Sequence, residues 1–230
     1  KFLASVFLRA LGLRGADEII KTFHPVERIS IKKGTFHWAV SESLAGRLAG
    51  KDFKIPKSDI AIQKKRKITK AAVAALLQAK RDTVEVMATE LEGAFAATDV
   101  VDPETGEVVL EVNEEVTPRI ISMVQEKQVE GLEVFFPERD QAGPVISETL
   151  RKDPIRSHEE SLVEVYRRLR PGDPPTLESS RSLFESMFFN RQKYDFSRVG
   201  RLKLNTKLGL ETPLDEKILH PQDFYDVIGY

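Results

Sequence analysis

Two segments of the chain that lie 48 residues apart carry the same order of local folding signals. In residues 68–86, Thr69 precedes a helical run, and a short strand pattern follows that run. In residues 116–134, Thr117 takes the same place and Pro118 comes next. A threonine oxygen caps the free N–H groups of a helix start, and proline fits the first helical position because its missing N–H is not needed there. The shared order predicts a duplicated helix–strand unit.

Strand signals surround these two segments. From residue 26 onward, Ile29 and Ile31 alternate with polar side chains, which is typical of a strand with one buried face. Residues 102–106 read Asp-Pro-Glu-Thr-Gly and lie between two valine-rich stretches, a pattern that predicts a hairpin turn. We therefore expect the middle of the chain to combine short helices with paired strands.

Helical patterns occupy both ends of the chain. Residues 2–11 and 16–23 are helix candidates that glycines separate. After residue 143 helical spacing returns, with a capping-box pattern that begins at Ser157. Farther along, a connector rich in proline and glycine ends one helix, and Thr176 is placed to cap the next.

These patterns predict an α+β fold in which one helical unit is discontinuous in sequence. Residues 1–25 and 144–230 form that helical unit, and residues 26–143 form an αβ unit inserted into it. The sequence has no initiator methionine and stops inside a helical pattern, so we expect a fragment of a longer protein.

Composition limits the classes of protein to which the chain can belong. It is 41% hydrophobic and 31% charged, enough for both a buried core and a polar surface. No apolar run reaches the roughly 18 residues of a transmembrane helix. The absence of cysteine excludes disulfides and thiol catalysis and fits a reducing cytoplasm. We expect a cytoplasmic protein that does not enter membranes.

Signatures of catalysis are missing. The four histidines are scattered without the spacing of a zinc helix, and no phosphate-binding glycine loop occurs. The acidic residues Asp99, Asp102, Glu114 and Glu115 fit a turn and a helix start better than a metal site. We predict no catalytic residue and no metal ligand. The basic run 64–67 is typical of a solvated hairpin tip, with contact to an anion as the alternative.

One segment near residue 200 has a composition suited to nucleic acid. Residues 190–207 contain six cations and only one acid, Asp195, with aromatic residues among them. Basic side chains bind phosphates, and Tyr194 has the shape to pack against a sugar or base. The phenylalanines of the segment fit a buried core instead. The six cations are Arg191, Lys193, Arg198, Arg201, Lys203 and Lys207.

Several motifs resemble the lobe of the bacterial RNA polymerase β subunit. They are Arg-Pro-Gly-Asp-Pro-Pro-Thr at 170–176, Phe-Phe-Asn at 188–190, Tyr-Asp at 194–195 and Val-Gly-Arg-Leu-Lys-Leu-Asn at 199–205. Leu-Arg-Ala-Leu-Gly at 8–12 and Ile-Ser-Glu-Thr-Leu-Arg at 146–151 match the same subunit in the same order. The resemblance is strong over 1–25 and 144–210, and it implies that 26–143 is a lineage-specific insertion built from tandem β–β′ modules.

The resemblance implies a role in transcription. In such an enzyme, a DNA-directed nucleotidyltransferase, the lobe forms one wall of the DNA channel and meets promoter and downstream DNA. The implied partners are the β′, α and ω subunits, a σ factor and DNA, in the cytoplasm at the nucleoid, with no small-molecule substrate for this fragment. The catalytic Mg²⁺ would be held by another subunit, so the isolated fragment would be inactive.

The resemblance also implies which residues contact DNA. Arg170, Lys193, Tyr194, Arg201 and Lys203 fall on the motifs that face DNA in this family. Lys193 stands where the family usually has arginine, so it keeps the charge but loses bidentate hydrogen bonding. Such contacts would hold the DNA backbone rather than read its sequence.

Two other classes of function remain open. In the first, the insertion is a protein-interaction module that docks transcription factors, which an exposed apolar face on it would favour. In the second, the chain is an enzyme in its own right, which the missing catalytic signatures disfavour.

Overall fold

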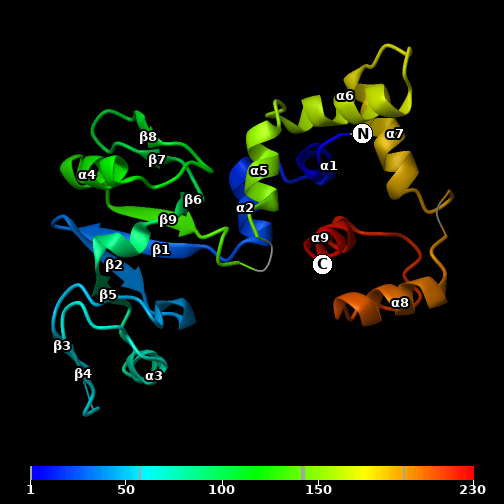
Figure 1. Ribbon diagram of the computed structural model, residues 1–230. Helices are drawn as coiled ribbons and strands as arrows, with labels where there is room; N and C mark the ends of the chain where they lie inside the picture. Colours follow the sequence, from blue (N-terminus) through cyan, green and yellow to red (C-terminus); the bar gives the residue numbers. More distant parts are fainter. Residues whose placement is uncertain (1, 57, 141–142, 194) are drawn as a thin grey trace. The chain divides into compact units, whose positions relative to one another are not determined.

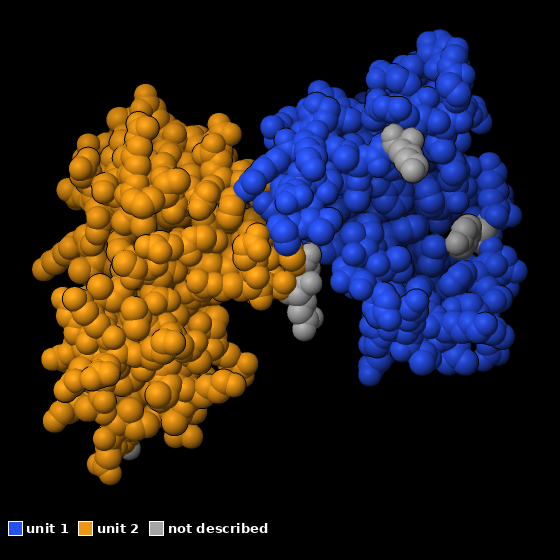
Figure 2. Space-filling view, viewed as in Figure 1, with its two compact units in different colours: residues 1–23, 144–230 blue, residues 24–143 orange. Residues whose placement is uncertain are grey.

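The computed structural model describes residues 2–56, 58–140, 143–193 and 195–230, and it divides the chain into two compact units (Figures 1 and 2). Unit 1 contains residues 1–23 and 144–230, and unit 2 contains residues 24–143. The first boundary follows Phe23 rather than residue 25. His24 belongs to unit 2 because its Nδ1 lies 2.9 Å from Asp140 Oδ2 and its ring packs against Phe135.

Unit 1 is helical in its described residues. Three of its helices start at hydroxyl side chains that accept a backbone N–H, namely Ser157, Thr176 and Ser197. Thr176 forms a complete capping box with Ser179, whereas Ser157 makes only half of the box that its sequence predicts. The helices are α1 (Ala4–Leu11), α2 (Ala16–Phe23), α5 (Val145–Lys152), α6 (His158–Leu169), α7 (Leu177–Phe188), α8 (Arg198–Leu208) and α9 (Pro221–Gly229).

The core of unit 1 joins the two separate stretches of sequence. In α1, Phe7 lies 5.4 Å from Phe188 and 5.5 Å from Phe224 between ring centroids, both in edge-on geometry. Phe184 lies 5.0 Å from Phe188 and is buried. Such edge-on aromatic pairs add to the burial of apolar area. The expectation that the phenylalanines of the segment near residue 200 serve the core is confirmed for Phe188 and Phe189, which pack against it.

Arg9 makes a second connection between the two stretches. Its side chain is buried, its Nε lies 3.6 Å from Asp153 Oδ2, and its Nη1 donates to the carbonyl of Arg14 at 2.9 Å. The ring of His158 donates from Nδ1 to the carbonyl of Arg9 at 2.7 Å. A buried guanidinium needs such partners because leaving it unpaired is costly. Residues 4–11 therefore pack as part of a core that is completed more than a hundred residues later.

Unit 2 is built on an antiparallel sheet with the strand order β5-β2-β1-β9-β6. In the described part of the unit, two short hairpins and two helices accompany it, so the chain is a mixture of helix and antiparallel sheet, as the α+β prediction requires. The five strands are β1 (Glu27–Lys32), β2 (Thr35–Ala39), β5 (Thr83–Val86), β6 (Phe95–Ala96) and β9 (Gly131–Phe135). The hairpins are β3 (Phe53–Lys54) with β4 (Ala61–Ile62) and β7 (Val100–Val101) with β8 (Val108–Leu110), and the other elements are α3 (Lys70–Gln78), α4 (Pro118–Glu126) and the single turns η1 (Glu42–Leu44) and η2 (Ala88–Leu91).

A buried arginine lies among the aromatic side chains of unit 2. The Arg47 guanidinium is 4.2 Å from the ring centre of Trp38 and 4.8 Å from that of Phe136. Its Nη2 donates to both carboxylate oxygens of Glu27, at 2.7 and 2.6 Å. Burial lowers the pKa of the Arg47 guanidinium, and the Glu27 carboxylate opposes that effect. The cation is therefore satisfied by the Glu27 carboxylate, by the Glu90 carboxylate 3.7 Å from Nη1, and by two aromatic faces.

The two expected helix–strand segments have closely matched backbones. Thr69 and Thr117 each cap a helix, α3 and α4, which leads into β5 and β9 respectively. Each helix is followed by a residue with positive φ, Lys80 and Gln128, both at 51°. The N–H of Ile68 donates to the carbonyl of Arg47 at 2.8 Å, just as that of Val116 donates to Ala94.

The match extends into the hairpins that precede the helices. An aspartate oxygen accepts the N–H of Lys64 in one hairpin (from Asp52, 2.6 Å) and of Val112 in the other (from Asp99, 2.7 Å). The second hairpin has one residue more, and a register irregularity between Val100 and Val101 accommodates it. For reference we call residues 42–86 the first repeat and residues 88–135 the second repeat, and that they are tandem copies of one duplicated unit stays a prediction.

The turn of the second hairpin depends on Asp102. Its Oδ1 accepts the N–H of Glu104 at 2.9 Å, and its Oδ2 accepts a hydrogen bond from Lys127 Nζ. These bonds, that of Lys127 first, lower the pKa of the Asp102 carboxyl to about 2 from an ordinary 3.8. The carboxylate thus has the structural role that its place in the turn predicts.

This shift predicts an acid-dependent loss of stability in unit 2. Because the folded-state pKa of Asp102 lies below its unfolded value, its contribution is complete above about pH 4 and is lost as the pH falls toward 2. Lys127→Met should lower the urea midpoint at neutral pH and reduce its decrease between pH 4 and 2. Fluorescence of Trp38, the one tryptophan in the sequence, measures unfolding of unit 2. Lys80→Met is the control; an equal pH dependence in all three proteins would contradict the prediction.

Candidate nucleic-acid interface

Arg170 lies at the end of α6 with its charge directed to solvent. It is the C-cap residue, and its N–H donates to the carbonyl of Tyr166 at 2.8 Å. Its side chain is 57% exposed and approaches Asp173 only at 4.0 Å. The hydroxyl of Tyr166 donates to the same carboxylate at 2.5 Å, which holds the turn after α6 in place. Arg170 therefore has an anchored backbone and a guanidinium available to an outside anion.

Lys193 lies in the turn between α7 and α8. Its side chain is exposed, and its Nζ donates to Ser186 Oγ at 2.6 Å. A hydroxyl does not neutralise the ammonium, so the charge remains available to a phosphate. The neighbouring Arg191 has a side chain that is 77% exposed and lies 3.9 Å from Glu216. Tyr194, which the sequence also predicts to contact DNA, lies outside the described residues.

Arg201 requires a correction. Its side chain has no exposed surface: Nη1 donates to Asp223 Oδ1 at 2.7 Å, and Nη2 donates to the carbonyl of Ile218 at 2.6 Å. The guanidinium also lies 5.0 Å from the ring centre of Phe196. A cation enclosed in this way cannot reach a phosphate, so its prediction as a direct DNA contact is wrong. Arg201 instead attaches α8 to the start of α9.

Lys203 and Lys207 lie on the side of α8 away from Arg201, whereas Arg198 is one helical turn before it. Lys203 is exposed, and no ion pair involves it among the residues that the structure describes. Arg198 is exposed at the first position of the helix, while Lys207 Nζ lies 4.9 Å from the ring centre of Tyr230. Gly200 allows the Phe196 ring to pack closely against α8, because a Cβ at this position would lie 3.2 Å from that ring. Of the two residues of this helix that the sequence predicts to contact DNA, Arg201 is buried and Lys203 is exposed.

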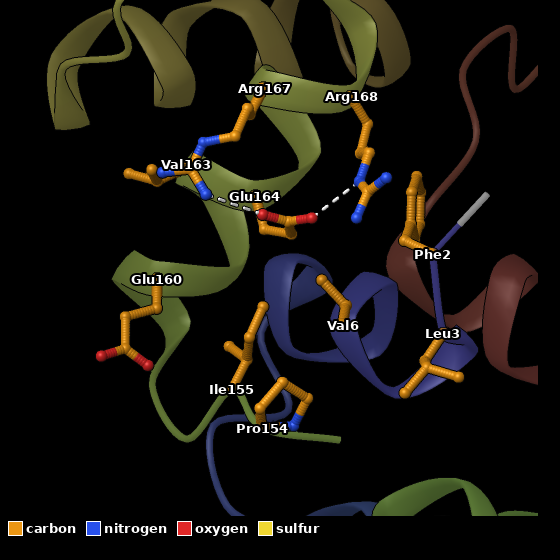
Figure 3. A pocket seen from close by; sticks show the side chains of 10 residues that line it. All are labelled: Phe2, Leu3, Val6, Pro154, Ile155, Glu160, Val163, Glu164, Arg167 and Arg168. Atoms are coloured by element: carbon orange, nitrogen blue, oxygen red, sulfur yellow. Dashed lines mark hydrogen bonds and ion pairs between the residues drawn. The ribbon is translucent and has the colours of Figure 1, made fainter. Parts of the chain in front are cut away.

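A groove on unit 1 was missed by sequence reasoning, because its lining comes from three separate stretches. It has a volume of about 690 Å³ and is largely apolar (Figure 3). At the rim of the groove, the Glu164 carboxylate accepts hydrogen bonds from Arg167 at 3.0 Å and from Arg168 at 2.7 Å, so both of these cations are paired. Arg170 does not line the groove. The lining residues are Phe2, Leu3, Val6, Pro154, Ile155, Glu160, Val163, Glu164, Arg167 and Arg168.

These side chains can bind anions. Arg170, Lys193 and Lys203 are cationic hydrogen-bond donors with exposed side chains. Within the described ranges, no group of three histidine or acidic side chains has an arrangement suited to a metal ion. None of the described helices has the length and apolar character to cross a membrane. The arrangement is suited to contacts with phosphates.

Comparison with known proteins places these residues in a family. Residues 138–230 match the family model described as RNA polymerase Rpb2, domain 2. The whole chain is 43% identical to the DNA-directed RNA polymerase subunit beta of Koribacter versatilis and 43% identical to that of Solibacter usitatus. It is 40% identical to the corresponding subunit of Sorangium cellulosum. The chain spans only 16%, 16% and 17% of these three relatives. It therefore belongs to the family of bacterial DNA-directed RNA polymerase β subunits.

Proposed function

We propose that the chain is the lobe of an RNA polymerase β subunit, forming part of the wall of the DNA channel and contacting promoter and downstream DNA. The observation that carries the proposal is the exposure of Arg170, Lys193 and Lys203 within the segment that matches Rpb2 domain 2. Arg170 and Lys193 occupy fixed turns, so their positions are set before DNA arrives. Tyr194 remains part of the proposal on its sequence motif alone.

The proposed division of labour gives this segment no chemical step. The whole enzyme would transfer nucleotides onto RNA with Mg²⁺ held by another subunit, and the lobe would hold the DNA backbone in place. Its partners would be the β′, α and ω subunits, a σ factor and the DNA, in the cytoplasm at the nucleoid. The exposed cations support this assignment.

A second candidate function concerns unit 2, which would be an insertion of tandem β–β′ modules that docks transcription factors. The matched backbones of the two repeats support the tandem assignment. The docking role rests on Val101 and Val108, which pair across the β7–β8 hairpin and are 45% and 51% exposed. Two adjacent exposed valines form a small apolar patch of the kind found in protein contacts. The patch is small, so we favour the DNA role for unit 1.

The DNA role predicts a specific effect of Arg170→Ala in the assembled polymerase. Removing one phosphate-binding cation should reduce the magnitude of the log–log salt slope of promoter binding by about 0.9 for duplex DNA or about 0.7 for a single strand. Open complexes should become shorter-lived on different promoters alike, because a backbone contact carries no base information. Their lifetimes, measured over a range of salt concentrations, test this.

Arg168→Ala is a matched control for this experiment. It removes an arginine from the same helix, but one already paired with Glu164 at 2.7 Å. Its salt slope should stay close to that of the wild type. RNA synthesis on a preassembled scaffold should be nearly unchanged in both variants. Identical slopes for Arg170→Ala and wild type would remove the DNA role from Arg170.

Arg201 is expected to act on stability instead. Arg201→Met leaves the buried Asp223 without its cation, and breaking a buried pair in this way costs about 3–5 kcal/mol of unfolding free energy. The double variant Arg201→Met with Asp223→Leu should recover much of the loss. Circular dichroism in urea should show destabilisation of unit 1 while Trp38 fluorescence, in unit 2, keeps its midpoint. Normal stability with weaker DNA binding would restore Arg201 as a contact.

A further inference from the structure

The hairpins of the two repeats in unit 2 carry opposite charge. Residues 51–69 of the first repeat contain seven lysines and arginines and two aspartates. The matching residues 99–117 of the second repeat contain seven acids and no lysine or arginine. Asp99, Asp102 and Glu114 accept hydrogen bonds within the second hairpin, but the fold does not require the other acids or the cations of the first hairpin. We call the exposed cations Lys51, Lys54, Lys64, Lys65, Arg66 and Lys67 the basic surface.

The cations of the basic surface are almost free of internal partners. Lys51 pairs with Glu85 at 2.9 Å. Across the described part of the chain, Lys54 and the four consecutive cations 64–67 have no carboxylate within ion-pair distance. Ordinary mixed surfaces intersperse both signs, as the Glu164 cluster on α6 does. The uncompensated positive charge therefore favours an external polyanion.

The backbone beneath the basic surface is held in place. Lys65 has a φ of 63°, and its N–H donates to the carbonyl of Ala49 at 2.8 Å. The N–H of Ala49 donates in return to the carbonyl of Arg66 at 3.0 Å, and Asp52 accepts the N–H of Lys64 at 2.6 Å. Ala49 itself is fully buried. The four cations thus project from a turn fixed to the core, which reduces the ordering cost of binding.

The surface lacks the apolar and aromatic groups that other partners need. Protein interfaces bury an apolar core, and single-stranded nucleic acid stacks on exposed aromatic rings. In unit 2, the exposed large apolar side chains described are Leu77, Val101 and Val108, all outside residues 51–69. Phe53 is buried, with Arg81 at 5.4 Å from its ring centre. Phosphate contacts to a duplex need cations alone.

The acidic hairpin makes the distribution of charge over unit 2 asymmetric. Figure 1 shows the β3–β4 hairpin and the β7–β8 hairpin at opposite ends of unit 2, with the sheet between them. A polyanion attracted to the basic surface is repelled by exposed Glu107 and Glu111 at the far end. Such a separation of charge orients an approaching duplex as well as attracting it.

We propose that the basic surface of unit 2 binds the phosphate backbone of duplex DNA, without sequence preference, at a site separate from Arg170, Lys193 and Lys203 on unit 1. The alternative reading of residues 64–67, a merely solvated hairpin tip, does not account for the reversal of charge between two hairpins of matching backbone. The proposal does not depend on the function proposed for unit 1.

The test uses the 230-residue chain and a fluorescent DNA duplex of random sequence, with binding followed by anisotropy at several salt concentrations. The test variant carries Lys64→Gln, Lys65→Gln, Arg66→Gln and Lys67→Gln. The control variant carries Lys32→Gln, Lys33→Gln, Lys80→Gln and Arg119→Gln, which are exposed cations of the same unit. Both variants change net charge equally, and both are checked for folding by Trp38 fluorescence.

The test variant should bind the duplex at least about tenfold more weakly at low salt, and its salt slope should fall in magnitude by about 0.9 for each phosphate that is no longer neutralised. The control variant should bind nearly as the wild type does. Equal weakening in both variants would show dependence on net charge alone and overturn the proposal, as would competition by polyglutamate at the same charge concentration as DNA. A third variant, Arg170→Ala with Lys193→Gln and Lys203→Gln, measures the unit 1 site separately, so either site can fail without the other.

Discussion

The attachment of α1 to helices that follow it by more than a hundred residues is the constraint on which this structure depends. Phe7 requires the rings of Phe188 and Phe224, and the buried Arg9 requires Asp153. The partners of Phe7 and Arg9 all lie outside the first stretch of sequence, so residues 4–11 on their own lack the contacts that hold them in a helix. An insertion at this point is tolerated only if its ends stay close, and the hydrogen bond between His24 and Asp140 joins the two ends of unit 2.

Local chemistry made most of the secondary structure predictable. Thr69, Thr117 and Thr176 cap helices as their sequence positions predict, because an N-cap depends on residues within one turn. The turn after Asp102 forms for the same reason. The order of strands in the sheet was not predictable, since β1 pairs with β9 across about a hundred residues and no local signal specifies that register.

The candidate site was predictable in part, and its errors have a physical cause. Charge density near residue 200 identified Lys193 and Lys203, which are exposed, together with Arg201, which is buried. The spacing of cations along a helix shows which share a face but not whether that face meets an acid. For Arg201 the acid is Asp223, which lies beyond a loop and on another helix. Only the tertiary structure separates a cation that holds the fold from one that is free to bind.

The two repeats of unit 2 show the same separation on a larger scale. Their buried positions, such as Ile68 and Val116, stay apolar because the packing of each hairpin and helix depends on them. Their exposed hairpin positions carry opposite charge, and a solvated side chain of either sign on a hairpin costs the fold little. Stability therefore accounts for what the repeats share, and it leaves their difference unexplained. A difference of that size, on backbones that share their helix caps and several hairpin hydrogen bonds, is best accounted for by what each surface binds outside the chain, and for the basic one that is a polyanion.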